Sequence, residues 1–189
     1  MEFAFFGISA LLSTVSSVTV ATLYVWPWLR SVKPREALAI LVAPHLFLRF
    51  IGLSMLVPGV VATALPPAFA VPAAFGDLVA GILAIVATVG LARRAVWARG
   101  AVWAFNTWGA ADLIYAGFQG VRILPGPGSL GAAFFLPTAI VPPLLVTHAL
   151  IFLVLIRSSI AQRNTTASDR MARNDSPAAS PNQFRHIRK

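Results

Sequence analysis

Five apolar runs, separated by short segments rich in polar residues, proline or glycine, dominate the chain. A membrane-crossing helix needs about 20 consecutive, mostly apolar residues, and each run reaches about that length. The pattern therefore predicts an all-α fold, an integral membrane helical bundle of five transmembrane helices within residues 1–157. The predicted spans cover residues 3–29, 37–65, 73–92, 100–121 and 132–156.

Basic residues occupy every second gap between the predicted spans. Cytoplasmic loops of membrane proteins carry an excess of lysine and arginine. The first and third gaps are basic and a basic segment follows the last span, whereas the other gaps carry only Arg122. We therefore predict an external N-terminus and a cytoplasmic C-terminus in a bacterial-type cytoplasmic (inner) membrane. The basic residues of the first and third gaps are Arg30, Lys33, Arg35, Arg93, Arg94 and Arg99.

The composition indicates that the lipid bilayer is the main partner of the chain. Of its 189 residues, 58% are hydrophobic and 11% are charged, whereas a soluble domain carries roughly 25% charged residues. The net charge of +9 comes largely from the loops and the C-terminal segment, not from a folded basic face. We therefore expect no nucleic-acid partner. The absence of cysteine excludes disulfides, thiolate metal sites and cysteine nucleophiles.

The C-terminal segment, residues 158–189, differs in composition from the rest of the chain. It is rich in serine, asparagine, alanine, arginine and proline and nearly lacks large apolar residues, which is typical of disorder. We predict a disordered basic cytoplasmic tail whose arginines lie near anionic lipid head groups.

Ionisable residues lie inside the apolar runs, where a charge is expensive and normally faces a protein interior or a wet cavity. His45 and Arg49 are four residues apart and share one helix face. With a helical rise of about 1.5 Å per residue, Arg49 and Asp112 fall at one depth near the bilayer centre. By the same reasoning, His45 and His148 fall at one depth, a turn closer to the cytoplasm.

Arg49 has two candidate carboxylate partners, Asp77 and Asp112. Depth favours Asp112, and Asp77 lies within reach of a long arginine side chain. An arginine and a carboxylate can form two parallel hydrogen bonds, which offsets much of the cost of burying both charges. Asn106 lies near the level of the histidines. The predicted buried polar site for protons or a solute consists of His45, Arg49, Asp77, Asn106, Asp112 and His148.

A polar stripe follows the fourth predicted span. Asp112, Tyr115, Gln119 and Arg122 recur at helical spacing. Because polar side chains facing lipid are costly, we expect the stripe to line an interior groove or to contact another subunit. No internal repeat is evident, and a bundle without one rarely makes a complete transporter alone. We therefore expect a homo-oligomer or a membrane partner subunit.

Three functional hypotheses follow. In the first, the buried site binds or transports a small polar solute or relays protons. In the second, His45 and His148 hold haem b or a divalent metal in a membrane enzyme or electron carrier. In the third, the protein is an accessory or assembly subunit whose polar groups fix helix packing. The sequence has no HExxH, GxSxG or CxxC motif and no phosphate-binding glycine loop. We therefore assign no catalytic residue, predict no cofactor and favour a non-enzymatic role.

Overall fold

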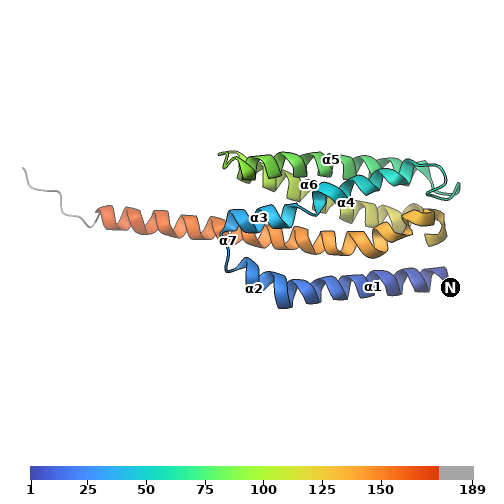
Figure 1. The fold of residues 1–189 in the computed structure, drawn as a ribbon, viewed down its shortest axis with the longest axis horizontal. Helices are drawn as coiled ribbons and strands as arrows, with labels where there is room; N and C mark the ends of the chain where they lie inside the picture. Colours follow the sequence, from blue (N-terminus) through green and yellow to red (C-terminus); the bar gives the residue numbers. More distant parts are fainter. Residues whose placement is uncertain (175–189) are drawn as a thin grey trace, which may run out of the picture. The chain divides into compact units, whose positions relative to one another are not determined.

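The computed structural model describes residues 1–174, and within them the regular structure is helical, with no strand. The chain divides into two compact units, residues 1–155 and residues 156–189. The first unit is a bundle of elongated helices that run side by side (Figure 1). This unit carries every residue of the predicted polar site.

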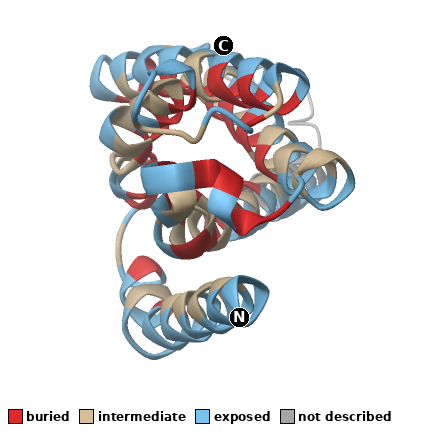
Figure 2. Cartoon of the chain, turned by 90° about the vertical axis from the view of Figure 1, so that its right-hand side faces the viewer, coloured by how far each residue is buried: buried red, intermediate tan, exposed pale blue. Residues whose placement is uncertain are grey.

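The first helical segment lies at the edge of the bundle, with most of its surface exposed (Figure 2). It consists of α1 (Glu2–Val20), a π-helical turn η1 (Ala21–Val25) and α2 (Trp26–Leu29). Pro27 has no amide hydrogen and its ring displaces a preceding carbonyl, which accounts for the wider turn. No residue of α1 is buried, so its many apolar side chains are left uncovered by the rest of the chain.

The second segment is interrupted, whereas the sequence predicted one helix over residues 37–65. Its elements are α3 (Pro34–Val42), α4 (His45–Leu48) and a 3-10 helix, η2 (Arg49–Leu56). The helix breaks at Pro44, which cannot donate to the carbonyl one turn earlier. Val57 adopts an extended conformation, as is usual before a proline, and a loop follows. The helical part of this span therefore ends at Leu56.

Two antiparallel helices form the central hairpin: α5 (Pro67–Ala92) and α6 (Ala98–Ile123). α5 begins at Pro67, before the predicted start at residue 73, because proline suits the first position of a helix. Gly76, Ala80 and Ala84 of α5 are buried. Small residues allow close approach of helix backbones, and Gly76 accepts a hydrogen bond from Trp108 Nε1 of α6 at 3.2 Å.

The last segment completes the bundle with a 3-10 helix, a π-helical turn and a long α-helix. These are η3 (Pro127–Phe134), η4 (Leu136–Ile140) and α7 (Val141–Asn174). Pro142 and Pro143 lack amide hydrogens, which accounts for the irregular turn before them. α7 continues through residues 158–174 of the predicted disordered tail, since elongating a helix needs no new nucleation. The rest of that tail, residues 175–189, lies outside the described residues.

Four helical segments of the described chain are long and apolar enough to cross a membrane. They are Glu2–Leu29, Pro34–Leu56, Pro67–Ala92 and Leu136–Ala161. The predicted fourth span, α6, has the same length as α5, 26 residues. It is absent from this set because Asn106, Asp112 and other polar residues lower its hydropathy.

The polar site lies between two apolar clusters of the first unit. One cluster includes Leu41, Val102 and Ile151, and the other includes Met55 and Leu130. In the second segment (residues 34–56), in α6 and in α7, the predicted site residues lie in sequence between residues of one cluster and residues of the other. The charged groups therefore have an apolar cluster on either side of them along the helices.

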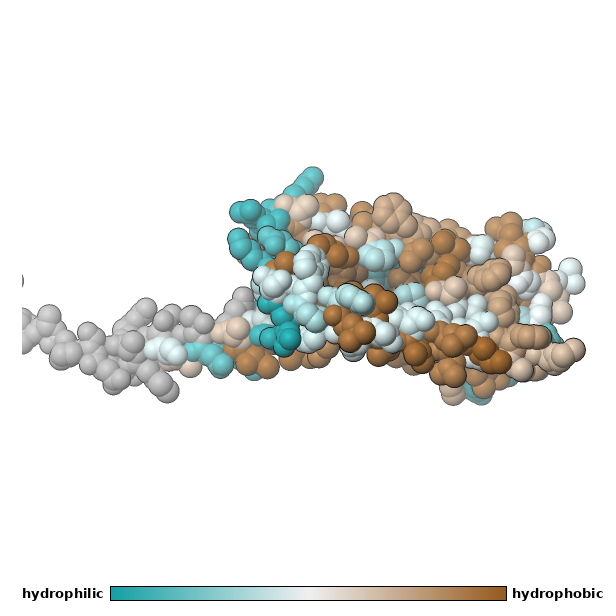
Figure 3. All heavy atoms as spheres, turned by 60° about the horizontal axis from the view of Figure 1, so that its bottom comes forward, coloured by the Kyte–Doolittle hydropathy of each residue, from teal (hydrophilic) through white to brown (hydrophobic). Residues whose placement is uncertain are grey.

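Hydrophilic side chains gather at one end of the helices, and hydrophobic ones cover much of the rest of the visible face (Figure 3). The α2–α3 and α5–α6 connections meet, because Nη2 of Arg35 donates to the carbonyl of Ala92 at 3.0 Å. Both connections carry exposed basic residues. These are Arg30, Lys33, Arg93 and Arg94.

Candidate binding site

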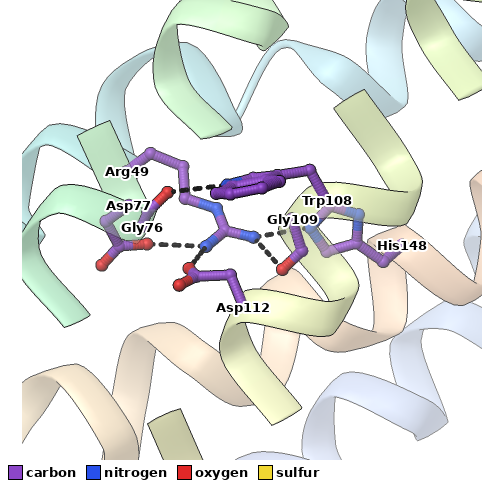
Figure 4. Close-up of polar contacts among 7 residues, drawn as sticks. All are labelled: Arg49, Gly76, Asp77, Trp108, Gly109, Asp112 and His148. Carbon is purple, nitrogen blue, oxygen red and sulfur yellow. Dashed lines mark hydrogen bonds and ion pairs between the residues drawn. The ribbon is translucent and has the colours of Figure 1, made fainter. Parts of the chain in front are cut away.

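Arg49 is the centre of a buried cluster contributed by η2, α5, α6 and α7 (Figure 4). Its side chain is fully buried. Nη1 donates to Oδ1 of Asp77 at 2.6 Å and to Oδ2 of Asp112 at 3.0 Å. Nη2 donates to the carbonyl of Gly109 at 2.6 Å and to Nε2 of His148 at 2.7 Å. One guanidinium group thus joins four helical elements.

Arg49 forms ion pairs with both candidate carboxylates, Asp77 and Asp112, and not with the favoured Asp112 alone. Both carboxylates bond to the same nitrogen, because Nη2 is occupied by the backbone of α6 and the imidazole of α7. In the described part of the chain, Arg49 is the only basic side chain that forms an ion pair with Asp77 or Asp112. The cluster therefore holds two carboxylates and one guanidinium.

Asn106 fixes the orientation of His148. Nδ2 of Asn106 donates to the backbone carbonyl of His148 at 3.1 Å, and Nδ1 of His148 lies 2.7 Å from Oδ1 of Asn106. Because Arg49 is always a donor, Nε2 of His148 must accept, and the ring proton must lie on Nδ1. His148 is therefore a neutral imidazole that accepts from Arg49 and donates to Asn106.

His45 is fully buried beside His148, with 4.4 Å between the two ring centroids. Its Nε2 lies 2.9 Å from Oγ1 of Thr147, and that hydroxyl donates to the carbonyl of Leu144 at 2.8 Å. The hydroxyl proton is therefore used, so Nε2 of His45 is the donor. Nδ1 of His45 is buried without a hydrogen-bond partner among the described residues.

The 3-10 geometry of η2 places Arg49 against the other helices. A 3-10 helix has three residues per turn, so residues three apart lie directly above one another. Arg49, Gly52 and Met55 share this face and are the buried residues of η2. A Cβ atom at Gly52 would overlap the carboxylate of Asp77. The absent side chain therefore lets η2 reach the acidic face of α5.

Two further glycines make room for the cluster. A Cβ at Gly76 would overlap the carboxylate of Asp112. A Cβ at Gly109 would overlap the ring of His148 and Nη2 of Arg49. The missing side chains thus let the charged groups approach the backbones of α5 and α6.

The polar stripe of α6 does not line an interior groove. Asp112 belongs to the buried cluster, but Tyr115 is 53% exposed. Arg122 is also exposed, and its guanidinium carbon lies 5.2 Å from the ring centroid of Phe118. Contact of this face with another subunit stays a prediction.

A cavity of about 640 Å³ adjoins the cluster. This volume lies in the usual range for small-molecule sites. Among the described residues that line it, Asp77 and Asp112 are the only ones with polar side chains. The cavity is therefore an apolar chamber with an acidic end. Its wall includes Phe6, Met55, Phe69, Leu113, Leu136 and Leu144.

A protein-family model described as a domain of unknown function, DUF8737, matches residues 5–156. The chain belongs to this family. No curated protein and no solved structure matches it. The part matched to DUF8737 contains the whole polar cluster and nearly the whole cavity wall, so both lie within the family domain.

The DUF8737 domain brings the six predicted residues into one connected cluster, although a role in binding solutes or protons stays a prediction. Sequence reasoning missed the carbonyl of Gly109, because no residue pattern marks a backbone acceptor. It also missed Thr147, although that residue directly precedes His148. Gly52 carried no signal, since its importance depends on the 3-10 geometry of η2.

The two histidines of the domain do not fit haem or metal ligation. Both ring nitrogens of His148 are engaged, with Asn106 and Arg49. Axial haem ligands lie on opposite sides of the iron, each nitrogen about 2 Å from a metal, and ring centroids only 4.4 Å apart do not leave that space. Among the described residues, no group of three His, Cys, Asp or Glu side chains is arranged to hold a metal ion.

Proposed function

We propose that the protein crosses a bacterial-type cytoplasmic membrane five times and binds an amphipathic small molecule in its cavity. Four segments have the length and hydropathy of membrane spans. A fifth crossing by α6 is supported by its 26 residues and by its packing along α5. Asn106 and Asp112 bond to His148 and Arg49, so these polar groups need not face lipid.

The distribution of charge supports the predicted orientation. The α2–α3 and α5–α6 connections carry exposed basic residues at one end of the bundle. At the other end, the loop before α5 has no lysine or arginine and the loop after α6 has only Arg122 nearby. The positive-inside rule then places the N-terminus outside and the C-terminus in the cytoplasm.

The cavity is the observation that carries the binding proposal. Its apolar wall suits a hydrocarbon body, and Asp77 and Asp112 suit one polar group at its end. The sequence predicted a small polar solute. An amphipathic molecule suits the cavity better, because a fully polar solute would lose its hydration without gaining hydrogen bonds from most of the wall.

The cavity reaches the lateral surface of the bundle. Phe3, Ile114, Phe118 and Val121 line it and are also exposed, Val121 to 89%. These residues belong to α1 and α6. In a membrane such an opening faces lipid, so a molecule dissolved in the bilayer would enter without crossing water.

Proton relay is a second candidate. The observation that favours it is the sharing of one Arg49 nitrogen by Asp77 and Asp112, since carboxylates held this close tend to share a proton. In proteoliposomes, this candidate predicts proton flux that Asp112→Asn abolishes. Equal flux in the wild type and in Asp112→Asn would exclude it.

An oligomer or partner subunit is supported by the exposed stripe on α6. Tyr115 and Arg122 have polar groups that a lipid surface would leave unpaired. A neighbouring protein surface would supply partners. Cross-linking through Tyr115→Cys in membranes tests this contact, and a purely monomeric pattern would contradict it.

The binding proposal is tested by filling the cavity. Ala116 lines the cavity, whereas Ala111 on the same helix is exposed and does not. Native mass spectrometry of wild-type protein incubated with decanol should detect one saturable adduct per chain. Ala116→Phe should remove the adduct and Ala111→Phe should retain it. The absence of a saturable adduct in the wild type, or its persistence in Ala116→Phe, would overturn the proposal.

A further inference from the structure

The acidic end of the cavity contains two carboxyl groups but only one guanidinium group bonded to them. Asp77 and Asp112 each line the cavity, and each bonds through one oxygen to Nη1 of Arg49. Arg49 is itself absent from the cavity wall. Within the described residues, no lysine or second arginine lines the cavity. A molecule in the chamber therefore meets two carboxylates at its polar end, with their single guanidinium partner behind them.

The second oxygen of each carboxylate lies against a glycine, Oδ2 of Asp77 against Gly52 and Oδ1 of Asp112 against Gly76. Oδ2 of Asp77 and Oδ1 of Asp112 receive no hydrogen bond from the described residues. Neither atom is among the fully buried unpaired ones, and the two side chains retain 14% and 10% exposure. When the carboxyl groups are ionised, these oxygens can accept hydrogen bonds but cannot donate them. The polar end therefore offers acceptors and negative charge to a hydrogen-bond donor.

We infer that the cavity selects amphiphiles with a cationic head, of the long-chain amine class. This inference rests on the proposed binding function of the cavity and names the chemistry of its ligand. An ammonium group supplies three donors and one positive charge, which together match two free carboxylate oxygens and one excess negative charge. The hydrocarbon chain would fill the apolar part of the chamber, between Phe69 and Leu144.

Other head groups fit less well. A sulfate or carboxylate head would approach two like charges in a poorly solvated site, which is unfavourable. A hydroxyl head donates one hydrogen bond but leaves the excess charge uncompensated. A proton on one carboxylate would balance the charge instead, and the chamber would then accept a hydroxyl and an ammonium head alike. Comparison of two probes that differ only in the head separates these cases.

The experiment compares decylamine, decanol and decyl sulfate on the full-length protein in lipid nanodiscs at pH 7, with adducts counted by native mass spectrometry. The amine is protonated at this pH, and its head is close in size to the hydroxyl. We expect decylamine to bind at least tenfold more tightly than decanol, and decyl sulfate to bind most weakly. Asp112→Asn should weaken decylamine binding to near that of decanol and leave decanol unchanged. Glu36→Gln, at an exposed carboxylate outside the cavity, is the matched control and should change neither.

The outcomes distinguish the binding function of the cavity from its preference for a cationic head. Equal binding of decylamine and decanol would overturn the cationic preference while the cavity function stands. Binding of neither probe, or binding unaffected by Ala116→Phe, would overturn both. If Asp112→Asn does not fold, Asp77→Asn takes its place, and the comparison of the three probes on wild-type protein decides the preference without any variant.

Discussion

Asn106 and His148 bond to each other twice, through the side-chain amide to the backbone carbonyl at 3.1 Å and between the imidazole and the amide oxygen at 2.7 Å. This double contact links α6 to α7 and fixes which imidazole nitrogen carries the proton. The other nitrogen is then free to accept from Arg49 at 2.7 Å. The position of the only cation in the cluster therefore depends on an uncharged pair next to it.

Replacing Asn106 with leucine should destabilise the bundle. Leucine has a similar branched shape but no polar group, so Nδ1 of buried His148 loses its acceptor, a cost of about 1–3 kcal/mol. We expect a clear fall in the thermal unfolding midpoint of the detergent-purified protein, measured by circular dichroism. Asn164→Leu, at an exposed position of α7, is the control and should unfold like the wild type. Equal midpoints for both variants would contradict the role of Asn106.

A methyl group at Gly76 should disrupt the acidic face of α5. The new Cβ would overlap the carboxylate of Asp112, which must then move away from Arg49. We expect a loss of about 1–3 kcal/mol from overpacking, measured by thermal unfolding. Gly117→Ala on α6 is the control, because nothing lies within 4 Å of its added Cβ. That variant should be neutral or gain up to about 1 kcal/mol from better helix propensity. A Gly76→Ala protein as stable as the Gly117→Ala control would show that Asp112 can move aside at no cost.

Removing the charge of Arg49 should lower the stability of the protein, and removing one carboxylate as well should restore part of it. Arg49→Gln leaves Asp77 and Asp112 buried without a cation. Removing one partner of a buried ion pair typically lowers the free energy of unfolding by about 3–5 kcal/mol, and we expect a loss of this size. The double variant Arg49→Gln, Asp77→Asn removes one of the two carboxylates and should recover part of the stability. Unfolding of the single and double variants in detergent measures both effects. Arg30→Gln, at an exposed site, is expected to be neutral. A fully stable Arg49→Gln protein would show that the cluster contributes nothing to folding.

The Asp112→Asn variant distinguishes a cluster that only fixes helix packing from one that binds a ligand. If the cluster only fixes helix packing, as the accessory-subunit hypothesis holds, Asp112→Asn lowers stability and leaves the decylamine adduct intact. If the cluster binds a ligand, Asp112→Asn in folded protein loses the preference for the amine. Adduct affinity and unfolding midpoint, measured on one preparation, therefore distinguish the two roles.

Helical rise predicted from the sequence that Arg49 lies level with Asp112 and His45 with His148, and the structure places both pairs in contact. The rotation of each helix was poorly determined by the sequence, since only the cost of exposing a few polar residues such as Arg49 or Asp112 to lipid constrains it. Tyr115 keeps helical register with Asp112 but lies on the exposed face, where contact with another subunit stays a prediction.

Three structural features had no readable signal in the sequence. The 3-10 helix η2 aligns Arg49 directly with Gly52, whereas in an α-helix the two would be offset by about 60°. The loop after Leu56 was hidden in an apolar run, although Pro58 and Gly59 with its positive φ mark it in the structure. The cavity is the space that side chains from several helices leave unfilled between them. Its presence therefore cannot be predicted from any single segment.

Whether α6 crosses the membrane is the decisive test of the five-span topology, because α6 is the one predicted span that lacks the hydropathy of a membrane-crossing helix. The chain has no cysteine, so single cysteines introduced in the loops report their own side. Ser31→Cys and Val96→Cys lie in the basic connections, and Thr63→Cys and Pro125→Cys lie at the opposite end; all except Pro125 precede α6. With a membrane-impermeant maleimide on intact cells, we expect Thr63→Cys and Pro125→Cys to be labelled. Ser31→Cys and Val96→Cys should be labelled only after permeabilisation, as the positive-inside rule requires. Labelling of Val96→Cys and Pro125→Cys from one side would mean that α6 does not cross, and that the Arg49 cluster does not lie within a bilayer-spanning bundle.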